Sequence, residues 1–195
     1  MRIFRSSTYR QTPWKNGGGV TTEIIVFPEG AALSDFDWRV SMAQVSSDGA
    51  FSEFVGIDRT LTVIEGAAMT LHFGEQRKVR LSPASPPFDF PGDVRVDAVL
   101  EGEALTDLNV MTRRGRWSHD VTKIGGNERH AVRTNANCVV LFCSGGAVTV
   151  EVTGHNAALL EKHDAVLYDA KGGELELACH GSGDALLIEL YKQSA

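Results

Sequence analysis

The sequence predicts an all-β protein made of two consecutive β-barrels. Apolar and polar residues alternate with a period of two in most segments, which is typical of strands with one face buried. Twenty glycines among the 195 residues separate these segments at short intervals, as in all-β sandwiches and barrels. Helix signals are scarce, and we expect a helical turn only around residues 31–35.

The alternating segments follow one another along the chain. In residues 36–43 the even positions are large and apolar, whereas the odd positions carry Asp37, Arg39, Ser41 and Ala43. The next two predicted strands, 61–63 and 69–73, are separated by the turn signal Glu65-Gly66. The later predicted strands lie within residues 94–99, 108–111, 138–142, 148–152, 165–168, 175–178 and 186–190.

Two similar segments indicate an internal duplication. Ala68-Met-Thr-Leu and Ala147-Val-Thr-Val each follow a glycine-bearing turn and lie 79 positions apart. Such a repeat indicates that one set of strands occurs twice. We expect a first barrel from residues 1–115 and a second from residues 116–195, with the N-terminal strands available to both.

Charge and composition exclude several function classes. The chain carries 19 basic and 25 acidic residues, a net charge of −6, which argues against nucleic acid as a partner. No apolar run approaches the ~20 residues of a membrane helix, so no membrane partner is expected. The N-terminus lacks a signal-peptide core, and Cys138, Cys143 and Cys179 are typical of buried thiols in a reducing compartment. We therefore expect a cytoplasmic protein, and paired barrel edges would allow a homodimer.

The histidines give no sign of a metal site. The closest two of the six stand eight residues apart, whereas two metal ligands on one strand need i, i+2 spacing to face the same side. We expect neither a metal nor another cofactor. No G-x-S-x-G motif marks a nucleophile, and Asp89 and Asp93 are typical of turn residues, so we assign no catalytic residue.

The stretch Pro13-Trp-Lys-Asn-Gly-Gly-Gly-Val-Thr raises the question of a binding loop. It is not a P-loop, because the lysine precedes the glycines and no helix follows. Asn16-Gly17 predicts a hairpin turn, and the further glycines indicate close approach of the backbone to another group. Trp14 and Lys15 would supply a flat wall and a cation suited to a small carboxylate. A flexible hairpin tip explains the same residues, and both interpretations stay open.

The last predicted strands of the two halves differ in polarity. In the first half, one face carries Asp107, Asn109, Met111 and Arg113, whereas residues 185–190 offer only one charge, a glutamate. Polar groups inside one barrel and not the other would mark a ligand cavity in the first half. A solvated outer face would give the same alternation, so this too stays open.

Five motifs within residues 10–115 form a pattern more specific than any one of them. They are Pro13-Trp-Lys-Asn-Gly-Gly-Gly-Val-Thr-Thr-Glu-Ile, Phe36-Asp-Trp-Arg-Val-Ser-Met-Ala, Phe51-Ser-Glu-Phe-Val-Gly-Ile-Asp-Arg-Thr-Leu, Phe90-Pro-Gly-Asp and Asp107-Leu-Asn-Val-Met-Thr-Arg-Arg-Gly. The set resembles the signature of the HutD/Ves family of bacterial proteins. One loop departs from it, because Gly49-Ala-Phe-Ser-Glu-Phe-Val-Gly lacks the two prolines that the family usually has there.

The resemblance implies a bicupin fold, in which one chain forms two cupin-like, jelly-roll barrels packed as one unit. It also implies a cytoplasmic protein that tempers histidine utilisation by sensing a small carboxylate intermediate, N-formylglutamate or urocanate. Carried over motif by motif, the ligand-binding positions implied by the resemblance are Trp14, Lys15, Asn16, Arg39, Ser41, Asp58, Arg59, Asp93, Asp107 and Asn109.

The preferred hypothesis is a regulator whose first barrel encloses a small carboxylate without a metal. Arg39 or Lys15 would pair with the carboxylate through charge-assisted hydrogen bonds. Asn16, Ser41 and Asn109 would select the remaining polar group of the ligand.

Other interpretations stay open beside it. A metal-independent hydrolase or isomerase, acting on a formyl, amide or imidazole acid, would use Asp93 or Asp107 as its base. A protein-interaction module would bind a protein partner and no small molecule. Independently of these alternatives, Asp58 and Arg59 could form a structural ion pair instead of contacting a ligand, and this interpretation also stays open.

Overall fold

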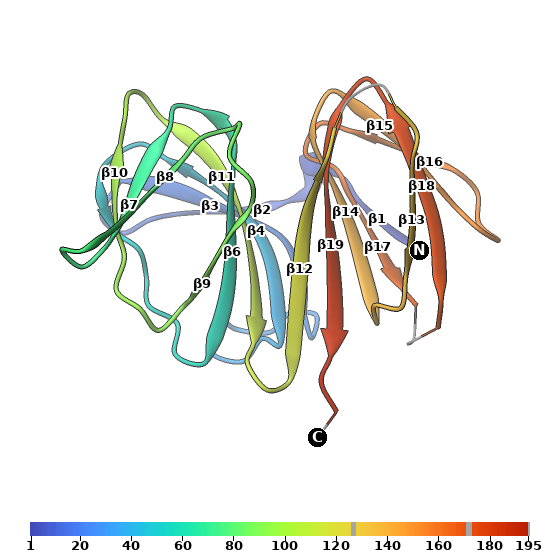
Figure 1. Ribbon diagram of the computed structural model, residues 1–195, viewed down its shortest axis with the longest axis horizontal. Helices are drawn as coiled ribbons and strands as arrows, with labels where there is room; N and C mark the ends of the chain where they lie inside the picture. The colour runs from blue at the N-terminus through green and yellow to red at the C-terminus, as the bar shows by residue number, and fades with distance from the viewer. Residues whose placement is uncertain (126–127, 171–172, 195) are drawn as a thin grey trace. The chain divides into compact units, whose positions relative to one another are not determined.

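The computed structural model describes residues 1–125, 128–170 and 173–194, and its chain forms two compact units (Figure 1). One unit is Arg10–Arg116, called the first unit here, and the other joins Met1–Tyr9 to Trp117–Ala195, called the second unit. Almost every regular element is a strand, which confirms the predicted all-β class. No helix among the described residues is long and apolar enough to cross a membrane.

The first unit contains two antiparallel sheets. A six-stranded sheet has the order β2-β3-β4-β11-β6-β9, and a four-stranded sheet has the order β5-β10-β7-β8. The strands are β2 (Arg10–Pro13), β3 (Gly19–Phe27), β4 (Trp38–Val45), β5 (Gly49–Ala50), β6 (Ile57–Gly66), β7 (Met69–Phe73), β8 (Arg77–Leu81), β9 (Phe88–Pro91), β10 (Asp97–Leu100) and β11 (Leu105–Arg113).

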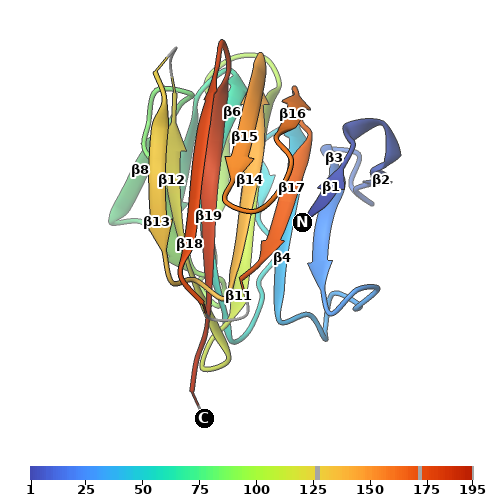
Figure 2. The same ribbon diagram turned by 90° about the vertical axis from the view of Figure 1, so that its right-hand side faces the viewer.

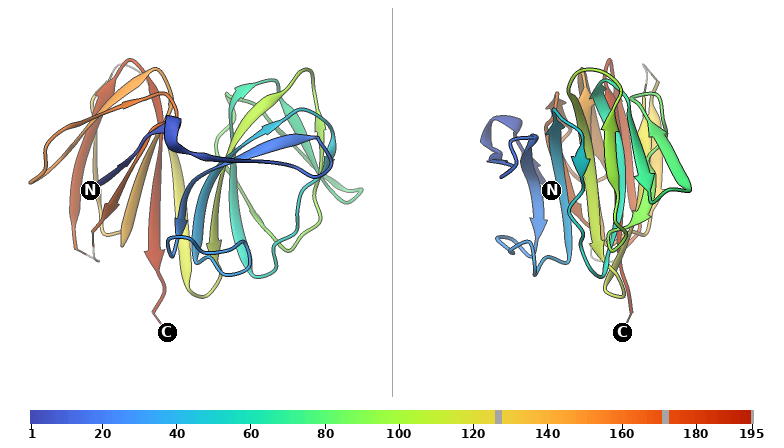
Figure 3. Two further views of the ribbon diagram at one scale, coloured as in Figure 1. Left: turned by 180° about the vertical axis from the view of Figure 1, so that it is seen from behind. Right: turned by 90° about the vertical axis from the view of Figure 1, so that its left-hand side faces the viewer.

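The second unit also contains two antiparallel sheets, with orders β1-β17-β14-β19-β12 and β13-β18-β15-β16 (Figure 2). Its elements are β1 (Arg2–Phe4), a short 3₁₀ helix (Ser6–Thr8), β12 (Trp117–Ile124), β13 (His130–Thr134), β14 (Cys138–Gly145), β15 (Ala147–Val152), β16 (Ala158–Glu161), β17 (Ala165–Asp169), β18 (Leu175–Gly181) and β19 (Asp184–Lys192). Figure 3 shows from behind how β1 lies along this unit before the chain continues into β2.

The two units share one topology, which confirms the predicted pair of barrels. The strand order β4-β11-β6-β9 in the first unit matches β12-β19-β14-β17 in the second. The order β5-β10-β7-β8 likewise matches β13-β18-β15-β16. The repeated segments therefore take equivalent places, in strands β7 and β15. Each unit adds its own edge: β2 and β3 beside β4, and β1 beside β17.

Each unit has its own apolar core, built from the inward positions of its alternating strands. A fully buried aliphatic side chain of this kind stabilises a fold by about 1.5–3 kcal/mol. The core of the first unit includes Val45, Leu61, Val63, Met69, Leu71, Leu81, Phe90 and Leu105. The core of the second includes Val139, Leu141, Cys143, Val148, Val150, Leu160, Leu177 and Leu187.

Two local expectations differ from the structure. Residues 31–35 form turns and no helix, with hydrogen bonds from Ala31 N to Pro28 O and from Asp35 N to Ala32 O at 3.0 Å each. The strand expected at 94–99 begins only at Asp97, because a turn at Gly92–Asp93 precedes it. Strand β9 ends just before that glycine. The alternation in residues 94–96 comes from a loop whose Val96 is fully buried.

Candidate functional site

The first unit holds a cavity of about 780 Å³. Its floor comes from strands β3, β4, β11 and β6, and its rim comes from β2 and the segments 13–16, 30–33 and 50–54. The lining side chains that carry charge or hydrogen-bonding groups are Arg10, Thr12, Trp14, Lys15, Asn16, Thr21, Glu23, Arg39, Ser41, Ser52, Arg59, Asp107 and Asn109. The volume is in the range of small-molecule sites.

Strand pairing orders the polar groups of the floor. In an antiparallel pair, residues directly opposite each other point to the same face. The register of β4, β11 and β6 therefore gives three rows of side chains on one face: Arg39–Met111–Arg59, Ser41–Asn109–Leu61 and Ala43–Asp107–Val63. Two arginines thus lie in the first row, neutral polar groups in the second and a carboxyl group in the third.

Arg59 is a buried cation on the cavity wall. Only 5% of the residue is exposed, and its guanidinium lies 5.0–5.6 Å from the ring centres of Phe51, Phe54 and Phe90. Its Nη1 donates to the carbonyl oxygen of Ser52 at 3.2 Å, whereas its Nε has no partner among the described residues. Burial lowers the pKa of Arg59 to about 10, so it stays charged at neutral pH.

Arg39 is the second cation of the floor, and its donors are partly engaged. Its Nε donates to Glu23 Oε2 at 3.0 Å, and its Nη1 donates to Ser41 Oγ at 3.2 Å. Arg39 is buried, while the side chain of Glu23 is 36% exposed. Glu23 therefore holds Arg39 from the open side of the cavity.

Asp107 and Asn109 supply buried acceptors. Asp107 is 1% exposed and Asn109 is 8% exposed. The Oδ1 atom of each side chain has no hydrogen-bond partner among the described residues. Burial raises the pKa of Asp107 to about 7, against the opposing charge of Arg59. An unsatisfied buried polar atom costs about 1–3 kcal/mol, so these groups mark a place where a partner would stabilise the protein.

The second unit has apolar residues at the equivalent positions. Its register pairs Val139 with Glu189, Leu141 with Leu187 and Cys143 with Ala185. Arg59, Asn109 and Asp107 thus correspond to Val139, Leu187 and Ala185, three members of the second core. The polar cavity is therefore a property of the first unit and not of the repeated fold.

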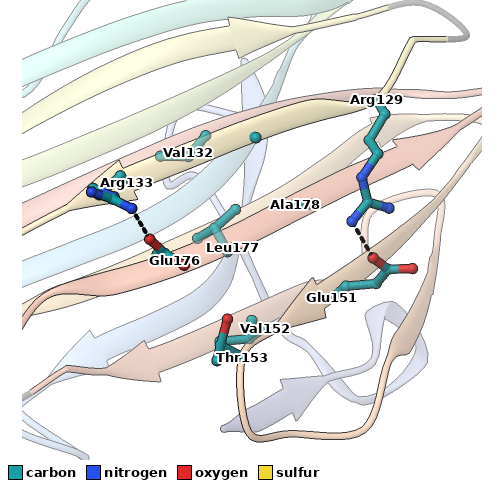
Figure 4. Close-up of a pocket in the computed structure, with 10 residues that line it drawn as sticks. Arg129, Val132, Arg133, Glu151, Val152, Thr153, Glu176, Leu177 and Ala178 are labelled. Carbon is teal, nitrogen blue, oxygen red and sulfur yellow. Dashed lines mark hydrogen bonds and ion pairs between the residues drawn. The ribbon is translucent and has the colours of Figure 1, made fainter.

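A hollow on the surface of the second unit differs from this cavity, because its charged groups are exposed and paired. It has a volume of about 500 Å³ and lies over β13, β15 and β18 (Figure 4). Arg129 there pairs with Glu151 at 2.6 Å, and Arg133 pairs with Glu176. Both arginine side chains are more than half exposed. Each charge already has a partner, so this hollow has no buried cation to attract an anion.

The Pro13-Trp-Lys-Asn-Gly-Gly-Gly stretch forms a hairpin tip at the rim. Trp14 Nε1 donates to Thr21 Oγ1 at 2.7 Å, and Asn16 Oδ1 accepts from the backbone N–H of Gly18 at 3.1 Å. The tight turn is centred one residue earlier than the predicted Asn16-Gly17 pair, because Gly17 N donates to Trp14 O at 3.0 Å, and Gly17 follows the turn with a φ of 72°. Trp14, Lys15 and Asn16 line the cavity, whereas the three glycines do not.

The glycines have structural explanations within the first unit. A Cβ atom on Gly19 would lie 2.5 Å from the carbonyl oxygen of Gln44 and 3.0 Å from the ring of Trp14. One on Gly18 would lie 2.6 Å from Ser47 Oγ. The close backbone approach expected for this stretch is therefore to the neighbouring β4 segment and to Trp14.

Two of the expected ligand-binding residues lie outside the cavity lining. Asp58 and Asp93 both accept hydrogen bonds from Arg114, whose Nη2 lies 2.7 Å from Asp58 Oδ1 and 2.9 Å from Asp93 Oδ1. The Arg114 contact holds the pKa of Asp93 at about 2. Asp58 and Arg59 are adjacent on β6 and point to opposite faces, so only Arg59 reaches the cavity.

The cavity brings together eight of the ten expected residues and adds others that the sequence analysis did not name. The eight are Trp14, Lys15, Asn16, Arg39, Ser41, Arg59, Asp107 and Asn109. Glu23, Phe51 and Phe54 also line it. Glu23 shares a strand face with Thr21, and this alternation was a usable signal. The two phenylalanines lie in an irregular loop, where no periodicity marks their direction.

Metal coordination has no obvious ligand set in the described residues. Within residues 1–125, 128–170 and 173–194, no group of three or more His, Cys, Asp or Glu side chains gathers closely enough to hold a metal ion. The charged groups of the cavity are instead two arginines and two carboxyl groups, together with the rim cations Arg10 and Lys15.

The fold and the cavity define a two-barrel, all-β protein with a polar cavity in one barrel. Its sequence agrees with one family over almost the whole chain: the sequence model of the HutD family matches residues 6–187. The chain therefore belongs to the HutD family, which confirms the resemblance seen in its motifs.

Relatives support the same assignment. A 21.2 kDa protein in the hutC 3′ region of Pseudomonas putida is 32% identical over 193 residues, covering 99% of this chain and 98% of the relative. The protein Ves of Citrobacter koseri is 43% identical over 104 residues, which is 53% of each chain. This chain thus resembles the first relative over its full length and Ves over about half of it.

Solved structures agree with the fold. HutD from Pseudomonas fluorescens SBW25 has a TM-score of 0.85 and 32% identity, with 99% of both chains covered. An oxalate decarboxylase from Lactobacillus farciminis has a TM-score of 0.65 at 9% identity, covering 99% of this chain and 86% of the enzyme. The second likeness concerns the fold alone, and together the two confirm the predicted bicupin architecture.

Proposed function

We propose that this HutD-family protein is a cytoplasmic regulator of histidine utilisation that binds a small carboxylate in the cavity of its first unit. The observation that carries the proposal is Arg59, a buried cation on the cavity wall with no ion-pair partner among the described residues. Asp107 attracts Arg59 electrostatically but forms no ion pair with it, and a buried charge without a counter-ion in contact is costly. A ligand carboxylate would supply that counter-ion.

The surroundings of Arg59 favour an anion of modest size. Three phenylalanine rings surround the guanidinium and exclude water from it, so a hydrogen bond to the carboxylate would be worth about 1.5–3 kcal/mol. Arg39 lies in the same row of the floor and offers a second positive charge. Lys15 and Arg10 at the rim would attract the anion toward the opening.

The relatives favour the same ligand class. One full-length relative is named for the hutC 3′ region, and the solved HutD structure is of a formate condition, formate being the simplest carboxylate. N-formylglutamate and urocanate are small carboxylates of histidine breakdown and are the proposed ligands. Both are compatible in size with a cavity of about 780 Å³.

Calorimetry with four compounds tests the proposal. The protein would be titrated with N-formylglutamate, urocanate, glutamate and formate, and each mixture would be assayed for turnover. We expect saturable binding of at least one compound, without product. Arg59→Gln should weaken that binding at least tenfold, and Arg39→Ala should have a similar effect.

Arg77→Gln is the matched control. Arg77 also stacks on two phenylalanine rings, at 5.1 Å and 5.5 Å, but it does not line the cavity. Its variant should bind as the wild type does. If none of the four compounds binds, or if Arg59→Gln and Arg77→Gln bind equally well, the proposed site is wrong.

One observation favours a second candidate, a metal-independent hydrolase or isomerase. Burial raises the pKa of Asp107 to about 7, which suits a general base at neutral pH. Asp93 lacks this property, because its salt bridge to Arg114 keeps it ionised. A progress curve that shows product from N-formylglutamate or urocanate, and loses it in Asp107→Asn, would establish the enzyme in place of the binder.

A further inference from the structure

The order of charged groups along the cavity floor limits which carboxylates can bind, beyond the requirement for a carboxylate group. Successive rows are two residues apart on β11, which is about 7 Å. The arginine row lies at one end, and Asp107 lies two rows away at the other. A ligand carboxylate held by Arg59 would therefore extend its remaining atoms toward Asn109 and Asp107. This step rests on the proposed function.

Beyond the arginine row, the floor holds two acceptor atoms that no hydrogen-bond donor of the described residues reaches. Asp107 and Asn109 each have a buried Oδ1 atom with no hydrogen-bond partner among the described residues. The residues directly opposite Asp107 are Ala43 and Val63, which carry no donor. The ligand itself is thus the natural source of a hydrogen-bond donor at this end.

The other charged groups around the floor leave the carboxyl group of Asp107 without an ion pair. Among the strands beside β11, the charged side chains that line the cavity are Arg39 on β4 and Arg59 on β6, and Glu23 on β3 follows one strand further. Glu23 is engaged by Arg39 at 3.0 Å. The carboxyl group of Asp107 has no such pairing partner within 4 Å among the described residues. Asp107 can therefore receive a donor without breaking an existing ion pair.

We propose that the cavity selects carboxylates that also carry an N–H group several bonds away from the carboxylate. Asp107 accepts a hydrogen bond from that N–H and thereby determines the selectivity. Asn109 lies between the two ends and can accept a second donor. A simple fatty acid would satisfy Arg59 but would leave Asp107 against apolar atoms. Such a ligand would bind more weakly, because the acceptor stays unsatisfied.

Pairs of ligands that differ in one atom test this selectivity. N-acetyl-ω-amino acids with two to five methylene groups would be compared with the matching acetoxy acids, in which oxygen replaces N–H. We expect the best amide to bind at least tenfold more tightly than its ester to the wild-type protein. In Asp107→Val this preference should fall below threefold, while ester binding changes less than threefold.

A second readout separates ligand recognition from a purely structural role of Asp107. A donor bound to the carboxylate favours its ionised form, so amide binding near pH 7 should release protons. Calorimetry in two buffers of different ionisation enthalpy measures this release. The release should be absent with the ester and absent in Asp107→Asn.

The outcomes distinguish this inference from the proposed function. Equal affinity of amide and ester for the wild-type protein would overturn the role of Asp107 while leaving the carboxylate site in place. Tighter binding of the ester than of the amide would also overturn the role of Asp107 and leave the carboxylate site in place. If no member of either series binds, and the four carboxylates of the earlier titration also fail, both proposals are wrong.

Discussion

Arg39 and Glu23 form an ion pair on the cavity floor, with Arg39 Nε 3.0 Å from Glu23 Oε2. The arginine is buried and the carboxylate is about one-third exposed. A ligand carboxylate that approaches Arg39 therefore meets a carboxylate already in place. Glu23 either shares Arg39 with the ligand or gives way to it, and in both cases its negative charge opposes anion binding.

Removal of that charge should strengthen anion binding. Partly exposed ion pairs are worth roughly 0.2–1 kcal/mol, so we expect Glu23→Gln to bind a small carboxylate about twofold to fivefold more tightly. The matched control is Glu101→Gln. Glu101 has the same side-chain exposure and pairs with Arg80 at 2.8 Å, but it does not line the cavity. Calorimetry checks both variants, and weaker binding by Glu23→Gln would show that Glu23 contacts the ligand favourably.

The buried carboxyl group of Asp107 should make stability depend on pH. In the unfolded chain an aspartate ionises near pH 3.8, whereas burial raises the pKa of Asp107 to about 7. Between these values the unfolded state binds fewer protons than the folded state, so the free energy of unfolding falls as pH rises from about 4 to about 7. Above pH 7 this effect is constant.

Asp107→Asn should remove the effect. Each pKa unit corresponds to about 1.36 kcal/mol, so the variant should be more stable than the wild type at pH 8 by about 4 kcal/mol without ligand, and the difference should vanish near pH 4. Urea denaturation at several pH values measures this. Asp97→Asn, whose side chain is 47% exposed, serves as control. A difference that does not change with pH would show that Asp107 is ionised throughout.

The sequence predicted which residues share a strand face, but it did not predict whether that face lines a barrel interior or the solvated surface. Alternation placed Arg39 with Ser41 and Asp107 with Asn109, and the structure places all four in one cavity. Alternation alone does not say whether such a face is a barrel interior or a solvated surface. That distinction depends on which strands pair, and the pairs here are far apart in sequence.

Adjacent residues of one strand cannot both face the cavity, and the strand alternation in the sequence already implies this. Asp58 and Arg59 were expected together at the site, yet successive residues of a strand point to opposite faces. Arg59 lines the cavity, whereas Asp58 pairs with Arg114. The bulge between Glu23 and Ile25 could not be foreseen, because it breaks the alternation by one residue.

The sequence left the N-terminal strands available to both barrels, but it did not indicate that Met1–Tyr9 joins the second unit. Arg5 Nη1 lies 2.6 Å from Asp164 Oδ2 within the second unit, and Ser6 N donates to Asp164 Oδ1 at 2.8 Å. The two partners are more than 150 residues apart along the chain. No local pattern in a segment as short as residues 2–8 specifies so distant a partner.

Arg114 should contribute to stability and not to binding. It holds Asp58 and Asp93 at the surface of the first unit, outside the cavity lining. Arg114→Ala should lower the melting temperature while carboxylate affinity changes less than twofold. Arg95→Ala, which loses an exposed and longer contact of 3.5 Å to Asp97, should have a smaller effect on melting.

The same contact predicts how the Arg114→Ala difference depends on pH. The pKa of Asp93 is lowered to about 2 by the Arg114 contact, so the stabilisation is present above pH 4 and is lost as pH falls toward 2. The melting temperatures of wild type and variant should therefore converge in acid. A tenfold loss of affinity in Arg114→Ala would instead indicate that Asp58 and Asp93 belong to the binding site.

Gly19 gives a direct test of what the three consecutive glycines do. An added Cβ would lie 2.5 Å from the Gln44 carbonyl oxygen, a backbone atom that cannot move away without breaking the sheet. Overpacking of this kind typically costs 1–3 kcal/mol, so Gly19→Ala should lower the free energy of unfolding by about that amount. Gly49→Ala is the control, because no atom lies within 4 Å of the Cβ position there.

The binding affinity of the folded variant decides between a structural and a ligand-contacting role for Gly19. The added methyl group also lies 3.0 Å from the ring of Trp14, which lines the rim. If the role of Gly19 is structural, the folded Gly19→Ala variant should bind a carboxylate with an affinity within threefold of wild type, because the floor residues Arg59 and Asp107 are unchanged. A glycine that contacts the ligand predicts a tenfold or greater loss of affinity, with little change in urea denaturation. The two measurements on one variant therefore assign the glycine stretch to the fold or to the site.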